Sequence, residues 1–237
     1  EILLDLVEIA VVLAEHDGQL PVDVAAVASC EPGVNPRRLE REVVLAYQSR
    51  ARPLVVVTKS DLVDDPELAA DIARNSAPGV DVVMVSNRSG EGIDELRSLL
   101  PPGTTVAFLG ASGVGKSTIV NSLAGESIQL EGEVRDGDAK GRHTTTTARL
   151  IVLGDLLVID TPGTRALAVW EVEPGIDLAF PEITALSESC RFADCSHRDE
   201  PGCAVRAATE SGEIDPERLA HWNLLLDEVT DLHRPEY

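Results

Sequence analysis

The stretch Gly110-Ala-Ser-Gly-Val-Gly-Lys-Ser-Thr118 decides the fold, because it matches the phosphate-binding pattern G-x-x-x-x-G-K-[ST] at every fixed position. Residues 104–109 before it (TTVAFL) are typical of a buried strand, and residues 117–124 after it (STIVNSLA) indicate a helix. A glycine-rich turn at a helix N-terminus directs backbone N–H groups at phosphate oxygens. The stretch therefore predicts a nucleoside-triphosphate site, with a chance glycine-rich turn as the alternative. The residues expected to bind nucleotide here are Gly110, Ala111, Ser112, Gly113, Val114, Gly115, Lys116, Ser117 and Thr118.

Two segments earlier in the chain indicate that the base is guanine. The apolar run at residues 54–57, typical of a buried parallel strand, leads into Thr58-Lys-Ser-Asp61. This sequence resembles the base-reading motif [NT]-K-x-D of GTPases, with Thr58 where asparagine is usual. A carboxylate at Asp61 can accept hydrogen bonds from the guanine N1–H and amino group, which adenine does not offer. A second predicted strand, residues 80–85, ends in a loop similar to S-A-x-x-G-x-G, which supports the base. We expect Thr58, Lys59, Asp61, Ser86 and Asn87 to contact the nucleotide.

Two segments after the phosphate loop are expected to complete the site for Mg²⁺ and the γ-phosphate. Residues 126–142 show no apolar period, which indicates a loop, and they lead to the threonine-rich run 143–147. A threonine there can place its hydroxyl on Mg²⁺, although a solvated turn is the alternative. Residues 148–153 and 156–159 are predicted strands, and the second delivers a D-x-x-G motif at 160–163. The expected Mg²⁺ ligands are Ser117, Thr144, Thr145 and Asp160, with the Gly163 N–H on the γ-phosphate.

The order of these motifs predicts a circularly permuted domain. In most GTPases the phosphate loop comes first, whereas here Asp61 and the loop at Ser86 precede Gly110. The same sheet forms if the usual termini are joined and the chain is cut elsewhere, because termini of such domains often lie close together. A strand at 22–29 and a helix at 35–50 extend the α/β pattern. We expect a segment of unknown role at 1–20, a permuted P-loop GTPase domain at 21–179 and a small C-terminal domain at 180–237.

The C-terminal part contains a cluster of potential metal ligands, Cys190-x₄-Cys195-x-His197-x₅-Cys203. Four such ligands within 14 residues suit one tetrahedral Zn²⁺ in a structural site. Scattered core cysteines and an iron–sulfur cluster are the alternatives. A helix at 217–232 is expected to cover this α-helical zinc domain with an apolar face formed by Leu219, Trp222, Leu225, Leu226 and Val229. Cys30 stands apart from the cluster and is expected to be a buried apolar filler.

Composition restricts the location and the partners. The net charge is −21, which argues against broad electrostatic attraction to nucleic acid. Three of the four cysteines lie in the metal-like cluster, which favours a reducing cytosol over disulfides. The apolar opening carries Asp5 and Glu8 and is too short and interrupted to cross a membrane. We therefore expect a cytoplasmic monomer without a membrane partner.

The motif order, the run Gly141-Arg-His-Thr-Thr-Thr-Thr147 and the cysteine cluster together resemble the circularly permuted, ribosome small-subunit-dependent GTPase A family (RsgA, also called YjeQ). The resemblance covers about residues 21–237. It implies a protein that converts GTP to GDP and binds the small (30S) ribosomal subunit and its rRNA late in maturation, with hydrolysis stimulated by the subunit. Family members begin with an OB-fold, for which residues 1–20 have no room, so weakened rRNA binding is expected.

The resemblance also implies a catalytic role for His143. Many GTPases place a glutamine after D-x-x-G to orient the attacking water, and the Thr164 side chain at that position is too short. An imidazole can hold or polarise a water near neutral pH, although a solvent-facing loop histidine is the alternative. The expected catalytic residues are His143, Lys116 and Thr145. A nucleotide-responsive, ribosome-binding checkpoint module with negligible turnover is the competing function.

Overall fold

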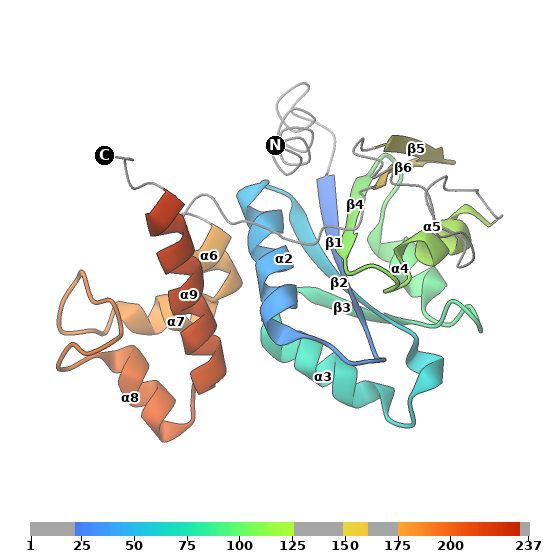
Figure 1. Ribbon diagram of the computed structural model, residues 1–237. Helices are drawn as coiled ribbons and strands as arrows, with labels where there is room; N and C mark the ends of the chain where they lie inside the picture. The colour runs from blue at the N-terminus through green and yellow to red at the C-terminus, as the bar shows by residue number, and fades with distance from the viewer. Residues whose placement is uncertain (1–21, 126–148, 161–174, 233–237) are drawn as a thin grey trace, which may run out of the picture.

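The computed structural model describes residues 22–125, 149–160 and 175–232, and within these ranges the strands form one six-stranded sheet (Figure 1). The strand order is β3-β2-β1-β4-β6-β5, and every neighbouring pair is parallel except β5 with β6. Their bounds agree with the predicted strands to within one or two residues, which confirms those predictions. The strands are β1 Val22–Ser29, β2 Arg52–Thr58, β3 Asp81–Val85, β4 Thr105–Gly110, β5 Arg149–Leu153 and β6 Leu156–Asp160.

Helices cover both faces of the sheet because successive strand residues point to opposite sides. In β2, Val55 and Val57 pack with α2 (Pro36–Gln48) and α3 (Pro66–Ser76), whereas Leu54 and Val56 pack with α4 (Ile93–Leu99) and α5 (Lys116–Ala124). The predicted helix at 35–50 is α2. It begins where it does because the Asn35 side chain accepts a hydrogen bond from the Arg38 N–H and Pro36 stands in the first turn.

The strand order places the candidate site at one edge of the sheet. β1 lies between β2 and β4, and all three run in the same direction. The carboxyl ends of parallel strands meet at one edge, and ligands bind there where the strand order reverses. The segments that follow β2, β3 and β4 are those expected to contact the nucleotide. They include the short 3₁₀ turn η1 (Ser60–Leu62) after β2.

The C-terminal part, α6 to α9, packs against α2 (Figure 1). Its helices are α6 Gly175–Ala179, α7 Pro181–Ser187, α8 Ala204–Ser211 and α9 Pro216–Leu232. The crossing of α6 and α2 is close, since a Cβ on Gly175 would lie 2.9 Å from the Val44 carbonyl oxygen. None of the helices in the described ranges is long and apolar enough to cross a membrane.

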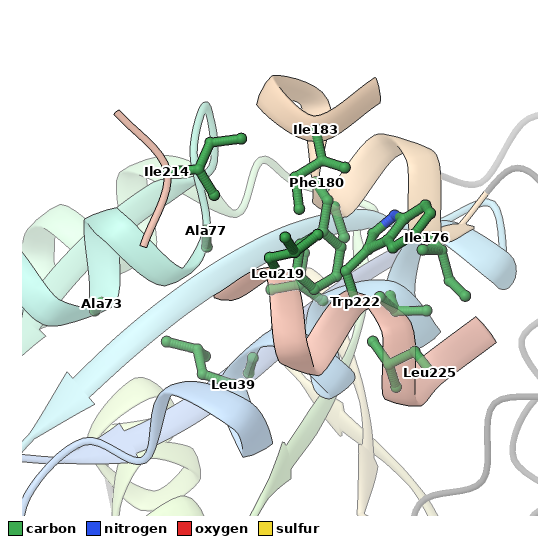
Figure 2. Packing of buried hydrophobic residues seen from close by; sticks show 14 of the residues in the cluster. Leu39, Ala73, Ala77, Ile176, Phe180, Ile183, Ile214, Leu219, Trp222 and Leu225 are labelled. Carbon is green, nitrogen blue, oxygen red and sulfur yellow. The ribbon is translucent and has the colours of Figure 1, made fainter. Parts of the chain in front are cut away.

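One hydrophobic core spans the α2 face of the sheet and the C-terminal helices. Leu39 of α2, Phe180 before α7 and Trp222 of α9 belong to the same buried cluster (Figure 2). The predicted domain boundary at 179/180 therefore falls within a continuous core. The apolar face of α9 covers α2 as well as the cysteine-bearing segment. Cys30 is also buried in this cluster.

Candidate functional site

The phosphate loop forms the strand–turn–helix unit that its pattern predicts. β4 ends at Gly110, the turn runs over residues 111–115, and α5 starts at Lys116. Gly110 has φ 149°, and a Cβ there would lie 2.6 Å from the Val27 carbonyl oxygen. Gly115 has φ 107°, in the region that side chains rarely adopt. Glycine is therefore required at both ends of the turn that presents the helix N-terminus.

The Lys116 side chain folds back over this loop. Its Nζ donates to the carbonyl oxygens of Gly110 at 2.8 Å and Ala111 at 2.9 Å. An ionised phosphate oxygen is a stronger acceptor for an ammonium group than a neutral carbonyl. The arrangement therefore holds a cation at the position where phosphates would meet the helix N-terminus of α5.

Thr58, at the end of β2, holds the phosphate loop through a hydrogen bond. Its side chain is fully buried, and its hydroxyl donates to the Val114 carbonyl oxygen at 2.6 Å. The Ala28 carbonyl oxygen lies 3.1 Å away on the neighbouring strand. The hydroxyl thus ties two strand ends to the loop. A role in holding the loop follows from this geometry, which the sequence pattern did not indicate.

The two base-reading motifs meet in space. The Ser86 hydroxyl donates to Oδ1 of Asp61 at 2.7 Å, although 25 residues separate them. The same oxygen of Ser86 accepts the N–H of Ser89 at 3.2 Å, which closes the loop after β3. Lys59, in a left-handed conformation with φ 61°, reaches the Glu31 carbonyl oxygen with its Nζ at 3.4 Å. The carboxylate expected to read guanine is therefore oriented by the second motif.

Asn87 connects the base side to the phosphate side. Its Oδ1 accepts a hydrogen bond of 3.4 Å from the Ser122 hydroxyl of α5. Its Nδ2 would lie 3.4 Å from a Cβ on Gly115. The ends of β2, β3 and β4 are thus joined by direct contacts into one site.

Four predicted site residues, His143, Thr144, Thr145 and Gly163, lie outside the described residues. The predicted Mg²⁺ ligand Asp160 is the last residue of β6. β6 runs parallel to β4, with Ile159 opposite Ala107. This register brings the end of β6 beside the strand that enters the phosphate loop.

One buried acidic residue of α2 was not predicted from the sequence. Glu42 of α2 is 1% exposed, and its carboxylate accepts a hydrogen bond of 2.8 Å from Nε of Arg38. Burial raises the pKa of Glu42 to about 7, although the charges of Arg38 and Lys116 act to lower it. The signal in the sequence is an acidic residue directly before the apolar positions Val43 and Val44.

The four predicted metal ligands come together between α7 and α8 and around the start of α8. One ligand atom from each of Cys190, Cys195, His197 and Cys203 lies within 4.8 Å of the others. Nδ1 of His197 is 3.3 Å from Sγ of Cys203 and 3.5 Å from Sγ of Cys190. Separations of this size suit ligands around a tetrahedral metal with bonds of about 2.0–2.3 Å. The geometry indicates that His197 would bind through Nδ1.

Backbone groups prepare this cluster for metal binding. The Ala204 N–H donates to Sγ of Cys190 at 3.3 Å, and the Arg206 N–H donates to Sγ of Cys203 at 3.4 Å. Burial raises the pKa of Cys190, but hydrogen bonds from the N–H groups at the start of α8 and with the other two thiols outweigh it, so this pKa lies below its usual value. Burial and the neighbouring sulfurs raise the pKa of Cys195 to about 11, so binding of a metal would release its proton. Thiolates are the form that metals bind. The donors therefore fit a Zn²⁺ ion.

Comparison with known proteins identifies the family. The sequence model of the family described as RsgA GTPase matches residues 22–170. The chain belongs to the RsgA GTPase family. Proteins named small ribosomal subunit biogenesis GTPase RsgA from Streptomyces avermitilis and Streptomyces coelicolor are each 47% identical over 212 residues, covering 87% of this chain. The aligned part is 57% and 58% of those two RsgA proteins, so the chain spans a little over half their length.

Two solved structures share the RsgA-type architecture. YjeQ from Thermotoga maritima aligns over 92% of this chain and 73% of its own, with a TM-score of 0.66 and 28% identity. YloQ, described as a circularly permuted GTPase, aligns over 92% of this chain and 70% of its own, with a TM-score of 0.62 and 28% identity. The strand order and these matches confirm the predicted circularly permuted α/β fold.

Proposed function

We propose that this protein binds and hydrolyses GTP and acts in the biogenesis of the small ribosomal subunit. The observation that carries the proposal is the joining of three strand ends by side-chain contacts. Thr58 holds the phosphate loop, and Ser86 holds Asp61. A generic phosphate loop needs neither contact. Because one contact holds the phosphate loop and the other holds Asp61, together they support a single site that selects guanine and also binds the phosphates.

The chemistry assigned to the residues follows from their types and places. Lys116 and the N–H groups of the loop stabilise the charge that develops on the transferred phosphoryl group. Mg²⁺ would be held by Ser117 and Asp160 with a threonine at 144 or 145, and it would neutralise phosphate charge. His143 would orient the attacking water, with Thr145 beside it. The products are GDP and phosphate.

The Cys₃His cluster is proposed to hold one structural Zn²⁺ per chain. The four protein ligands would fill all four positions of a tetrahedral ion, so no position would remain for water or substrate. The ion would stabilise the segment from Cys190 to Cys203 and take no part in hydrolysis.

The proposed partner is the small ribosomal subunit with its rRNA. Residues 180–237 contain 13 acidic and 5 basic side chains, which offers little attraction to phosphates. We therefore propose a weak, salt-sensitive association that is stronger with GTP than with GDP. The protein would act as a cytoplasmic monomer.

A hydrolysis assay with and without purified small subunits tests the proposal. We expect slow release of phosphate from GTP that rises with added subunits and is abolished by Lys116→Ala. ATP as substrate is the matched control. Binding of GTP without release of phosphate in either condition would contradict the proposal. That result would indicate a nucleotide-responsive checkpoint module.

A further inference from the structure

The histidine of the Cys₃His cluster adopts a backbone conformation that is uncommon for its residue type. His197 has φ 58°, in the left-handed region, and it is only 4% exposed. A residue other than glycine persists there when its surroundings hold it in place. Its Nδ1 lies 3.3 Å from Sγ of Cys203 and 3.5 Å from Sγ of Cys190. The contacts that hold His197 therefore also decide whether its ring faces the sulfurs.

The ring of His197 packs against the indole of Trp222, which comes from α9. The two ring centroids are 5.2 Å apart and the rings are tilted by 52°, a separation that is usual for interacting aromatic rings. Trp222 is 8% exposed and belongs to the buried core cluster shown in Figure 2, which also includes Cys203. The imidazole therefore contacts the cysteine sulfurs and also a ring that is fixed in the core.

The residue after His197 attaches the same turn to the same helix. Arg198 donates from Nη2 to the Asp227 carboxylate at 2.6 Å and from Nε to Oδ1 of Asn223 at 3.2 Å. The Arg198 side chain is 46% exposed, so these contacts lie at the surface. Two consecutive residues of the metal-binding segment thus contact one stretch of α9, residues 222–227. The position of α9 therefore restricts where the ring of His197 can lie.

The contribution of Trp222 to this contact comes from its ring and not from its N–H group. Within the described part of the chain, Nε1 of Trp222 is buried and has no hydrogen-bond partner. The contact with His197 is therefore one of packing between rings. A phenylalanine at this position would keep an aromatic ring beside the imidazole while removing only an N–H group that makes no hydrogen bond there.

We propose that Trp222 is a positioning residue for metal binding, which holds the imidazole of His197 with Nδ1 towards the cysteine sulfurs. The inference rests on the proposed Zn²⁺ site and extends that site from the segment 190–203 to α9. Without the indole, the imidazole would be free to turn away from the sulfurs. A metal ion would then be held by three thiolates, with water in place of the histidine.

Titration of the full chain with Co²⁺ tests this inference, because the visible absorption bands of Co²⁺ depend on its ligands, whereas Zn²⁺ has a filled d shell and no such bands. His197→Ala gives the reference spectrum of the cluster without imidazole. At saturating Co²⁺ we expect Trp222→Ala to give this reference spectrum. It should also bind Co²⁺ about 10–100-fold more weakly than the unaltered protein, the range for residues that orient metal ligands. Trp222→Phe should keep the spectrum of the unaltered protein.

Two further variants separate positioning of the ligand from general stability. Trp222→Met keeps a flexible apolar side chain in the core and replaces Trp222→Ala if the latter does not fold. It should also give the reference spectrum. Leu225→Ala removes a fully buried side chain from the same helix and the same cluster. It should lower the free energy of unfolding but keep the spectrum of the unaltered protein, because the ring of Trp222 remains in place.

An unchanged Co²⁺ spectrum in folded Trp222→Ala or Trp222→Met would overturn the inference, because the imidazole would then bind the metal without the indole. The reference spectrum in Leu225→Ala would also overturn it, since general loosening of the core would then decide the ligand set. A full chain that binds no Co²⁺, or whose Co²⁺ spectrum is the same with and without His197, would instead refute the proposed Cys₃His metal site and this inference with it.

Discussion

Asp61 and Ser86 form a hydrogen bond of 2.7 Å that unites two motifs from different strand ends. The carboxylate that would read guanine is held by a buried hydroxyl, and that hydroxyl also accepts the Ser89 N–H. Base recognition in this protein therefore depends on a pair rather than on one residue.

Asp61→Asn should weaken GTP binding by about 2–3 kcal/mol, because a charged acceptor for two guanine donors is lost. It should also shift preference towards xanthine nucleotide, whose edge offers the complementary pattern. Ser86→Ala should cost only about 1 kcal/mol and leave guanine preferred. Competition binding with labelled GDP measures both variants. Equal competition by ATP and GTP in the unaltered protein would refute the assignment of Asp61.

Thr58→Val should weaken GTP and GDP binding to the same extent without changing base preference. The substitution leaves the buried Val114 carbonyl without its partner, at a cost on the order of 1–3 kcal/mol. Thr58→Ser keeps the hydroxyl and is the control. Titration calorimetry with GDP, GTP and xanthine nucleotide would check the result. A change in base preference would mean that Thr58 contacts the base.

Glu42→Gln should reduce the loss of stability between pH 5.5 and pH 8. The pKa of Glu42 is 4.5 in the unfolded chain and is raised to about 7 in the folded protein. Its contribution to the free energy of unfolding is therefore fully present below pH 4.5 and is lost as pH rises through 7. This shift corresponds to about 2 kcal/mol between the two pH values. Urea unfolding of both proteins at both pH values gives the comparison. The same pH dependence in the variant would show that Glu42 does not titrate in this range.

Glu200→Ala should weaken Zn²⁺ binding by about 10–100-fold, the range for residues that orient metal ligands. Its carboxylate accepts hydrogen bonds from the Ser196 hydroxyl and from the N–H groups of Ser196, Arg198 and Asp199. The turn around His197 depends on these bonds. Chelator competition measures the affinity, with Glu210→Ala on the exposed side of α8 as control.

The same group should show little pH dependence near neutrality. The hydrogen bonds, first that from the Ser196 hydroxyl, lower the pKa of Glu200 to about 2. The contribution of Glu200 to the stability of the folded turn is therefore present above its unfolded pKa of about 4.5. It is lost only as pH falls from about 4.5 towards 2. This account would be contradicted if the ratio of the Zn²⁺ affinities of the unaltered protein and Glu200→Ala changed between pH 6 and pH 8.

His143→Ala should slow GTP hydrolysis by roughly 10²–10⁴-fold, the usual range for a positioned acid–base or water-orienting group. Nucleotide affinity should stay nearly unchanged, because the phosphate loop and Asp61 are untouched. Single-turnover hydrolysis and GDP binding separate the two effects. An equal loss of affinity and rate would instead assign His143 a role in shaping its loop.

Several features of this protein could be predicted from sequence because they are local. The turn from Gly110 to Gly115 needs glycine backbone between a strand and a helix, and these requirements stand in adjacent residues. The metal cluster is equally local, since its ligands lie within 14 residues. The order of the motifs predicted the permutation for the same reason, because order is a property of the chain itself.

The tertiary structure alone decided which polar residues are buried and what they contact. Arg218 meets Glu40 across 178 residues, and Thr58 meets Val114 across 56. An arginine or glutamate on an amphipathic helix is usually solvated, so no pattern marks these as buried. Their burial follows from α9 docking on α2, which depends on the shape of a core shared by distant segments. The position of the C-terminal helices α6 to α9 therefore results from packing between distant segments. Each nucleotide motif, in contrast, is formed by consecutive residues.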